Sequence, residues 1–224
     1  MARYIPFPAR MMLTPVSPDK IDDFVGVELS PLGFKRTRPR RWVQTATPYI
    51  RNMFEFQAIK GGQYSARWGF SLDFVPCLSG GRLRWKRTVT TARFDLCIDP
   101  IDESGRVPEW CSFSRFLEAC EGRMAPAAKM ATRAAKLDYS RVKSIADVVG
   151  IFQQRAAMRF RRFSLKNYVQ TDLAWGLALI AVGQAAEGER HLRLFCDQFS
   201  IDRQDKMIRH AISAAKEATV PQAV

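Results

Sequence analysis

The sequence has little of what enzyme active sites and metal centres are commonly built from. Its 224 residues include two histidines and five cysteines, and no two cysteines form a CxxC pair. Metal ligands usually come as closely spaced pairs of such residues, so we expect no metal site and no cofactor. Gly61-Gly62 and Gly80-Gly81 are typical of turns and lack the strand–GxGxxG–helix context of a phosphate loop. These absences make an enzyme the less favoured class.

We also expect no segment that directs the protein into or across a membrane. Pro6, Pro8 and Arg10 interrupt the N-terminal stretch, which therefore does not form the apolar core of a signal peptide. The longest apolar run, residues 173–186, is shorter than the roughly 20 residues that span a bilayer. With these absences and an odd number of cysteines, we expect reduced thiols in a cytoplasmic protein that does not bind membranes.

Acidic residues are scarce relative to basic ones. The chain has 35 Lys and Arg against 22 Asp and Glu, which gives a net charge of +13. Between Gly33 and Arg93, thirteen basic residues stand against two acids, Glu55 and Asp73, so this region carries +11. A local excess of this size favours a polyanionic partner.

The hydrophobic pattern predicts an α+β protein. An irregular, proline-rich lead over residues 1–16 is followed by a helix capped by Ser17. Period-two alternation then predicts an antiparallel meander of about five strands with one buried and one solvated face. We expect these strands near residues 41–45, 49–59, 64–75, 82–88 and 92–98.

Helical periodicity dominates after Trp110 and predicts a bundle of four or five helices on the apolar face of the sheet. Ser144, with Asp147 three residues on, is a short variant of the capping box. The expected boundaries are helices over 114–121, 127–137 and 144–163, a helix from Thr171, a link at 187–189 and a last cap at Asp202. We therefore divide the chain into a lead over 1–16, an α+β meander domain over 17–110 and a helical region over 111–224.

Three short motifs carry a family resemblance. They are Leu32-Gly33-Phe34-Lys35-Arg36, Arg41-Trp42 and Trp68-Gly69-Phe70-Ser71-Leu72-Asp73. Over residues 18–100 the chain resembles the bacterial domain-of-unknown-function 4304 family, which has a leading helix and then a strand meander. The resemblance implies a small bacterial α+β domain. It implies no catalytic residues, because that family has no established activity.

Strand alternation predicts where the positive charge lies. If Trp68, Phe70 and Leu72 face the core, Arg67 faces outward. The candidate residues for binding nucleic acid or another anion are a basic cluster after the first helix and the outward cations of the strands: Lys35, Arg36, Arg38, Arg40, Arg41, Arg67, Arg82, Arg84 and Lys86. Like charges on neighbouring strands repel, and an anionic partner relieves that repulsion. The alternative is a solvated loop whose arginines pair with acids of the helices.

These observations favour a non-enzymatic accessory or regulatory module that docks on nucleic acid or on an acidic protein surface. One alternative is an immunity-type or scaffold protein that blocks an acidic protein partner. A weaker alternative is a metal-dependent hydrolase that uses Asp99, Asp102 and Glu103, although a turn at Asp99-Pro100 explains these acids more simply. We expect both histidines, His191 and His210, on the surface. The aromatic residues of the strands belong to the predicted core, so we expect no base-specific recognition.

Overall fold

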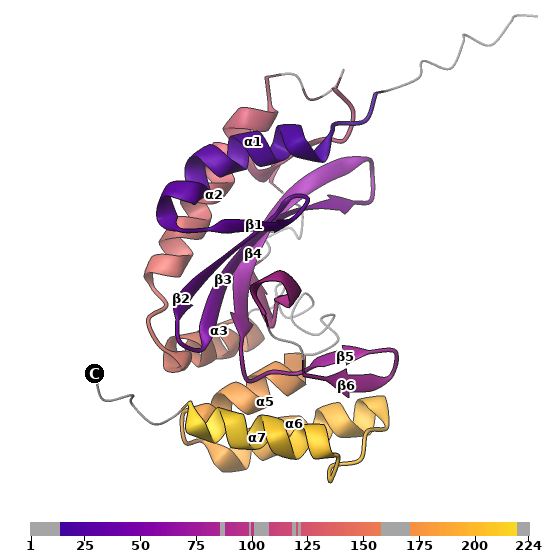
Figure 1. Cartoon of the computed structure of the whole chain (residues 1–224), viewed down its shortest axis with the longest axis vertical. Helices are drawn as coiled ribbons and strands as arrows, with labels where there is room; N and C mark the ends of the chain where they lie inside the picture. The colour runs from indigo at the N-terminus through magenta and orange to yellow at the C-terminus, as the bar shows by residue number, and fades with distance from the viewer. Residues whose placement is uncertain are drawn as a thin grey trace, which may run out of the picture.

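The protein has the predicted α+β fold, seen in a computed structural model that describes residues 14–85, 88–98, 100, 108–117, 120, 122–157 and 171–218. An antiparallel sheet forms the centre of the molecule, and helices α1 (Pro18–Leu29) and α2 (Met124–Ser140) lie on one side of it (Figure 1). Three later helices gather beyond one end of the sheet, beside a separate β-hairpin (Figure 1).

The main sheet contains six strands in the order β1-β2-β3-β4-β7, with β8 also paired to β4. Their bounds are β1 Lys35–Arg38, β2 Arg41–Thr47, β3 Ile50–Ile59, β4 Gln63–Leu72, β7 Leu96–Ile98 and β8 Ser112–Ser114. The register places Trp42 opposite Phe54, and Phe54 opposite Trp68. These residues therefore share one face, which we call the helix face.

The helix face carries the hydrophobic core, as predicted. Trp68, Phe70 and Leu72 are all buried. Helix α2 is fixed to the sheet by two polar contacts: the Tyr139 hydroxyl donates to the Met53 carbonyl at 2.6 Å, and Trp68 Nε1 donates to Asp138 at 2.7 Å. Aromatic packing and these hydrogen bonds together position the sheet under α1 and α2.

Helix α1 begins where its sequence predicts. The Ser17 hydroxyl accepts a hydrogen bond from the Lys20 backbone N–H, and Pro18 occupies the first turn. Ile21, Val25 and Leu29 form its buried stripe. A 3₁₀ turn, η1 (Ser30–Leu32), follows and ends in Gly33, whose φ of 82° lies in the left-handed region that glycine adopts easily. This turn leads the chain directly into β1.

The C-terminal half consists of α3 (Ile145–Ala157), α5 (Thr171–Ala181), α6 (Ala185–Phe199) and α7 (Lys206–Glu217). The predicted capping contact is present at α3, where Asp147 accepts from the Ser144 backbone N–H at 2.9 Å. Helices α5 and α6 cross at two glycines: a Cβ on Gly188 would lie 2.6 Å from the Gly176 carbonyl oxygen. This αα-hairpin requires glycine at both positions.

The strand prediction is wrong at three places. Residues 35–38, taken as a loop, form edge strand β1, because they pair with β2. Residues 82–84 do not join the meander; they form β6 (Arg82–Arg84), which pairs only with β5 (Cys77–Ser79). Residues 112–114, expected in part to begin a helix, extend the sheet as β8. Each error concerns a short segment that becomes a strand through its pairing: β1 with β2, β6 with β5 and β8 with β4.

The C-terminal half is helical as predicted, but some helix boundaries are wrong. Residues 187–189 lie inside α6, and the link between α5 and α6 falls at residues 182–184. Asp205, not Asp202, caps α7, and its carboxylate accepts from the Met207 backbone N–H. Of the described helices, α1 and α2 cover the helix face, whereas α5, α6 and α7 form a layer beyond the end of the sheet (Figure 1).

Candidate nucleic-acid interface

The face of the sheet opposite the helix face carries three of the strand arginines in ion pairs. Glu55 accepts from Arg41 at 2.5 Å and from Arg67 at 3.0 Å. Arg51 pairs with Asp73 at 2.5 Å. The two acids of this region are thus engaged by arginines of their own sheet, and the side chains of Arg41, Arg67 and Glu55 are 13–18% exposed.

This second face is covered rather than solvated, which corrects the prediction. A segment that includes the 3₁₀ turn η2 (Val89–Thr91) crosses it and places Ala92 against Val43 and Met53. The Arg67 guanidinium lies 4.8 Å from the centre of the Phe94 ring. Alternation predicted the direction of Arg67 correctly, but Arg41 and Arg67 lie in a paired, partly buried layer.

Strand β1 differs from the covered face of the sheet, because only one of its three cations forms ion pairs with described residues. Arg36 forms ion pairs of 2.9 Å with both Asp19 and Asp22 of α1. Lys35 and Arg38 are exposed, and neither has an ion-pair partner among the residues that the structure describes. Burial raises the pKa of the Asp22 carboxyl, and the positive charge of Arg36 opposes that rise. The edge of the sheet therefore mixes one neutralised arginine with two available cations.

Arg40 is held in a fixed position in the turn between β1 and β2. Its φ of 62° lies in the left-handed region, which costs an arginine about 1 kcal/mol. Its backbone N–H donates to Asp22 at 2.9 Å, and its carbonyl accepts from the Phe56 N–H at 3.0 Å. Its side chain lies over the Tyr64 ring, 4.8 Å from the ring centre, and donates to the Tyr64 hydroxyl at 2.7 Å.

A second guanidinium approaches the same ring. Arg115, which follows β8, lies 5.8 Å from the centre of Tyr64 and is exposed. Neither Arg40 nor Arg115 has a carboxylate partner among the described residues. Two like charges at one aromatic ring repel each other, and a phosphate between or beside them would relieve the repulsion. Arg115 lies outside the predicted set, because residues 114–121 were expected to form a helix.

Hairpin β5–β6 exposes the remaining described candidates. Arg82 and Arg84 are exposed, Leu83 between them is half-buried, and Trp85 packs against the His210 ring of α7 at 4.4 Å. The predicted alternation is therefore present in this hairpin. A cavity of about 430 Å³ lies between the hairpin and the start of α7, and its lining includes Arg82 and Lys206 together with Asp202 and Asp205. Lys86 lies outside the described residues.

The hydrolase alternative gains no site from the described part of the chain. Asp99, Asp102 and Glu103 lie outside it. A polar cavity of about 460 Å³ between α2 and α3 contains two carboxylates, but Asp138 accepts from Trp68 and Asp147 caps α3. Hydrogen bonds from the Lys143 and Ser144 backbone and from the Ser144 hydroxyl lower the pKa of Asp147. No group of three or more potential ligands among the described residues could hold a metal ion.

His191 and the five cysteines are buried in the folded chain. His191 is buried rather than exposed, a correction to the prediction: its Nδ1 lies 2.7 Å from Asp172, and Trp175 stacks on its ring. All five cysteines are free and buried. Burial raises the pKa of Cys111 to about 12 and also raises that of Cys196, so both thiols stay protonated and are poor nucleophiles.

Comparisons with family models, with curated proteins and with solved structures found no match to this chain. The resemblance to the domain-of-unknown-function 4304 family therefore stays a prediction. None of the helices within the described ranges has the length and apolar character needed to cross a membrane.

Proposed function

We propose that this protein is a nucleic-acid-binding module that contacts phosphates through two groups of cations. The edge group consists of Lys35, Arg38, Arg40 and Arg115, and the hairpin group consists of Arg82 and Arg84. The turn η2 contacts β1 and β2, and the exposed Arg93 lies just after it. We expect an extended polyanion to contact both groups.

The observation that carries the proposal is the distribution of acids. Glu55 and Asp73 are engaged by Arg41, Arg67 and Arg51, so they do not neutralise the edge and hairpin groups. Cations that form no ion pair within the described chain create a positive potential, and this potential attracts phosphates and speeds association. Guanidinium groups also match phosphate geometry with two parallel hydrogen bonds.

Recognition by these groups depends on the backbone of the nucleic acid and not on its bases. Trp68 and Phe70 lie in the core, and the Tyr64 ring is buried beside Arg40. Stacking of bases on aromatic side chains, which single-strand binders use, therefore has no platform at these positions. We expect similar affinity for oligonucleotides of different sequence.

The test is a salt titration of binding, followed by fluorescence anisotropy of labelled DNA and RNA oligonucleotides. If about five phosphates are neutralised, the plot of log K against log salt has a slope of about −4.5 for duplex DNA. The variant Arg82→Gln/Arg84→Gln should flatten this slope by about 2. Salt-independent binding, or an unchanged slope in the variant, would overturn the proposal.

A matched variant separates local contacts from net charge. Arg190 and Arg203 are exposed but paired with Glu187 and Asp197, so Arg190→Gln/Arg203→Gln removes the same charge from the helical layer. We expect its slope to equal that of the wild type. Polyglutamate of matched charge serves as a competitor. If it displaces the oligonucleotide more effectively than unlabelled DNA or RNA does, the partner is an acidic protein surface and the nucleic-acid proposal is wrong.

A further inference from the structure

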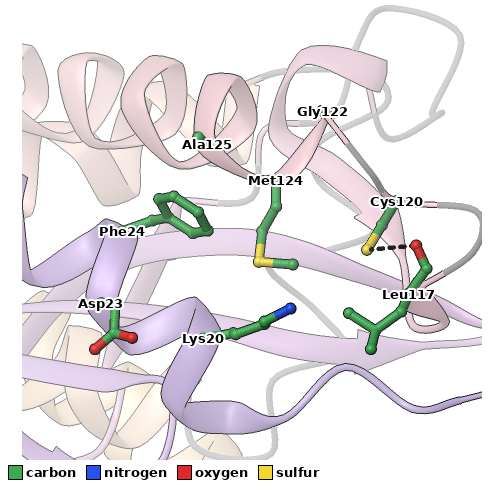
Figure 2. A pocket seen from close by; sticks show the side chains of 8 residues that line it. All are labelled: Lys20, Asp23, Phe24, Leu117, Cys120, Gly122, Met124 and Ala125. Atoms are coloured by element: carbon green, nitrogen blue, oxygen red, sulfur yellow. Dashed lines mark hydrogen bonds between the residues drawn. The ribbon is translucent and has the colours of Figure 1, made fainter.

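A cavity of about 730 Å³ lies between α1 and the start of α2. Its described lining is largely apolar, with Phe24 of α1, Leu117 after β8, and Met124 at the first turn of α2 (Figure 2). Pockets of roughly 300–1,000 Å³ with apolar walls and a few convergent polar groups are typical small-molecule sites. The volume and lining here fall within that description.

Phe24 gives the cavity one wall and remains 40% exposed. The buried stripe of α1 is formed by Ile21, Val25 and Leu29, so Phe24 lies beside that stripe and not in it. Its ring faces Met124 across the cavity (Figure 2). A ligand with an aliphatic chain would remove this apolar surface from water, which is favourable.

Lys20 supplies the positive charge at this cavity, whose lining also includes the acidic Asp23. Figure 2 shows its ammonium group directed towards the space between Met124 and Leu117, while the Asp23 carboxylate points to the other side. Lys20 has no ion-pair partner among the described residues. A lysine stem along an apolar wall with its ammonium at the mouth is the arrangement that binds the head of an amphipathic anion.

We propose that this cavity binds one aliphatic carboxylate of the fatty-acid class. The acyl chain lies between Phe24, Leu117 and Met124, and the carboxylate accepts hydrogen bonds from the Lys20 ammonium. A neutral lipid would leave the ammonium unpaired, and a cationic amphiphile would be repelled by it. The site shares no residue with the edge or hairpin group, so it is independent of the proposed nucleic-acid binding.

The experiment titrates the full chain with dodecanoate, dodecanol and dodecyltrimethylammonium, each below its micelle concentration, by isothermal calorimetry. We expect saturable 1:1 binding of dodecanoate, about tenfold tighter than dodecanol, which corresponds to one hydrogen bond to a charged group. Lys20→Met keeps most of the side-chain length and should weaken dodecanoate binding about tenfold. Lys129→Met, at an exposed α2 position that does not line the cavity, should leave it unchanged.

NMR of the methionine methyl groups tests whether the ligand binds in this cavity. Dodecanoate should shift the ¹³C-methyl resonance of Met124, which lines the cavity, and leave that of Met130, which is exposed elsewhere on α2, in place. Three results would each overturn the proposal: no saturable binding, equal affinity for the three amphiphiles, or equal loss in the Lys20 and Lys129 variants. A shift at Met130 without one at Met124 would also contradict it.

Discussion

Two sets of arginines in this molecule have the same chemistry and opposite surroundings. Arg41, Arg51 and Arg67 lie on the covered face of the sheet and are paired with Glu55 or Asp73. The second set, Arg38, Arg82 and Arg84, is exposed on an edge strand and a hairpin, with no acid partner in the described chain. The first set stabilises the sheet, whereas the second is available to a ligand. Charge counting alone does not separate them.

The largest expected effect tests the strand register on which this comparison depends. Phe70 is fully buried on the helix face, so Phe70→Ala should lower the free energy of unfolding by about 3–5 kcal/mol. Urea titration of the variant and the wild type measures this. A loss below about 1 kcal/mol would indicate a register shifted by one residue, which would turn Arg67 into the core.

The second-largest expected effect is that of removing Glu55, the acid that Arg41 and Arg67 share. Glu55→Gln leaves Arg41 and Arg67 partly buried without their carboxylate, and we expect a loss of roughly 2–3 kcal/mol, somewhat below that of a fully buried pair. The matched change is Glu187→Gln, which breaks an exposed pair and should cost less than about 1 kcal/mol. Equal losses in urea titrations would contradict the assignment of a structural role to the first set.

A single truncation in each set sharpens the contrast. Arg67→Ala should cost about 1–2 kcal/mol, because the side chain loses its pair with Glu55 and its contact with Phe94. Arg82→Ala should stay within about 0.5 kcal/mol, as expected of an exposed residue without such contacts. Thermal or urea unfolding of the two variants side by side provides the measurement. A larger loss for Arg82 would reverse the comparison.

The smallest effect concerns Asp22, which pairs with Arg36. Because burial raises the pKa of this carboxyl, its contribution to stability is fully present at low pH and is lost as pH rises through the raised pKa. In Asp22→Asn this loss is absent, so the variant should gain stability relative to the wild type as pH rises from 3.5 towards neutrality, beginning near the ordinary carboxyl value of 3.8. Urea midpoints across that pH range test the sign. The opposite trend would mean that the pair with Arg36 outweighs burial.

The local hydrophobic pattern was sufficient to predict which side chains of a strand lie on opposite faces of the sheet. Alternation correctly predicted that Trp68 and Arg67 lie on opposite faces, because neighbouring side chains of a strand always do. The pairing of Glu55 with Arg41 and Arg67 depends on the register of three strands, which no local pattern contains. Arg115 was missed for the same reason, since it approaches Tyr64 only because β8 pairs with β4.

The buried His191 illustrates the same limit in the helices. Its sequence neighbours are charged, which is typical of an exposed position, but α5 supplies Asp172 and Trp175 to cover and bind its ring. Its burial follows from the two glycines that bring α5 and α6 close together. These glycines indicate burial only when it is known that the two helices pack against each other.

The most direct test of the central claim observes both sets of arginines in one sample. Two-dimensional NMR of arginine Nε–H groups, assigned by single Arg→Lys variants, would follow each guanidinium as an oligonucleotide is added. We expect shifts for Arg38, Arg82 and Arg84, with Arg41, Arg51 and Arg67 unchanged. Shifts at the paired arginines, or none at the exposed ones on saturation, would contradict the division between a structural set and a binding set.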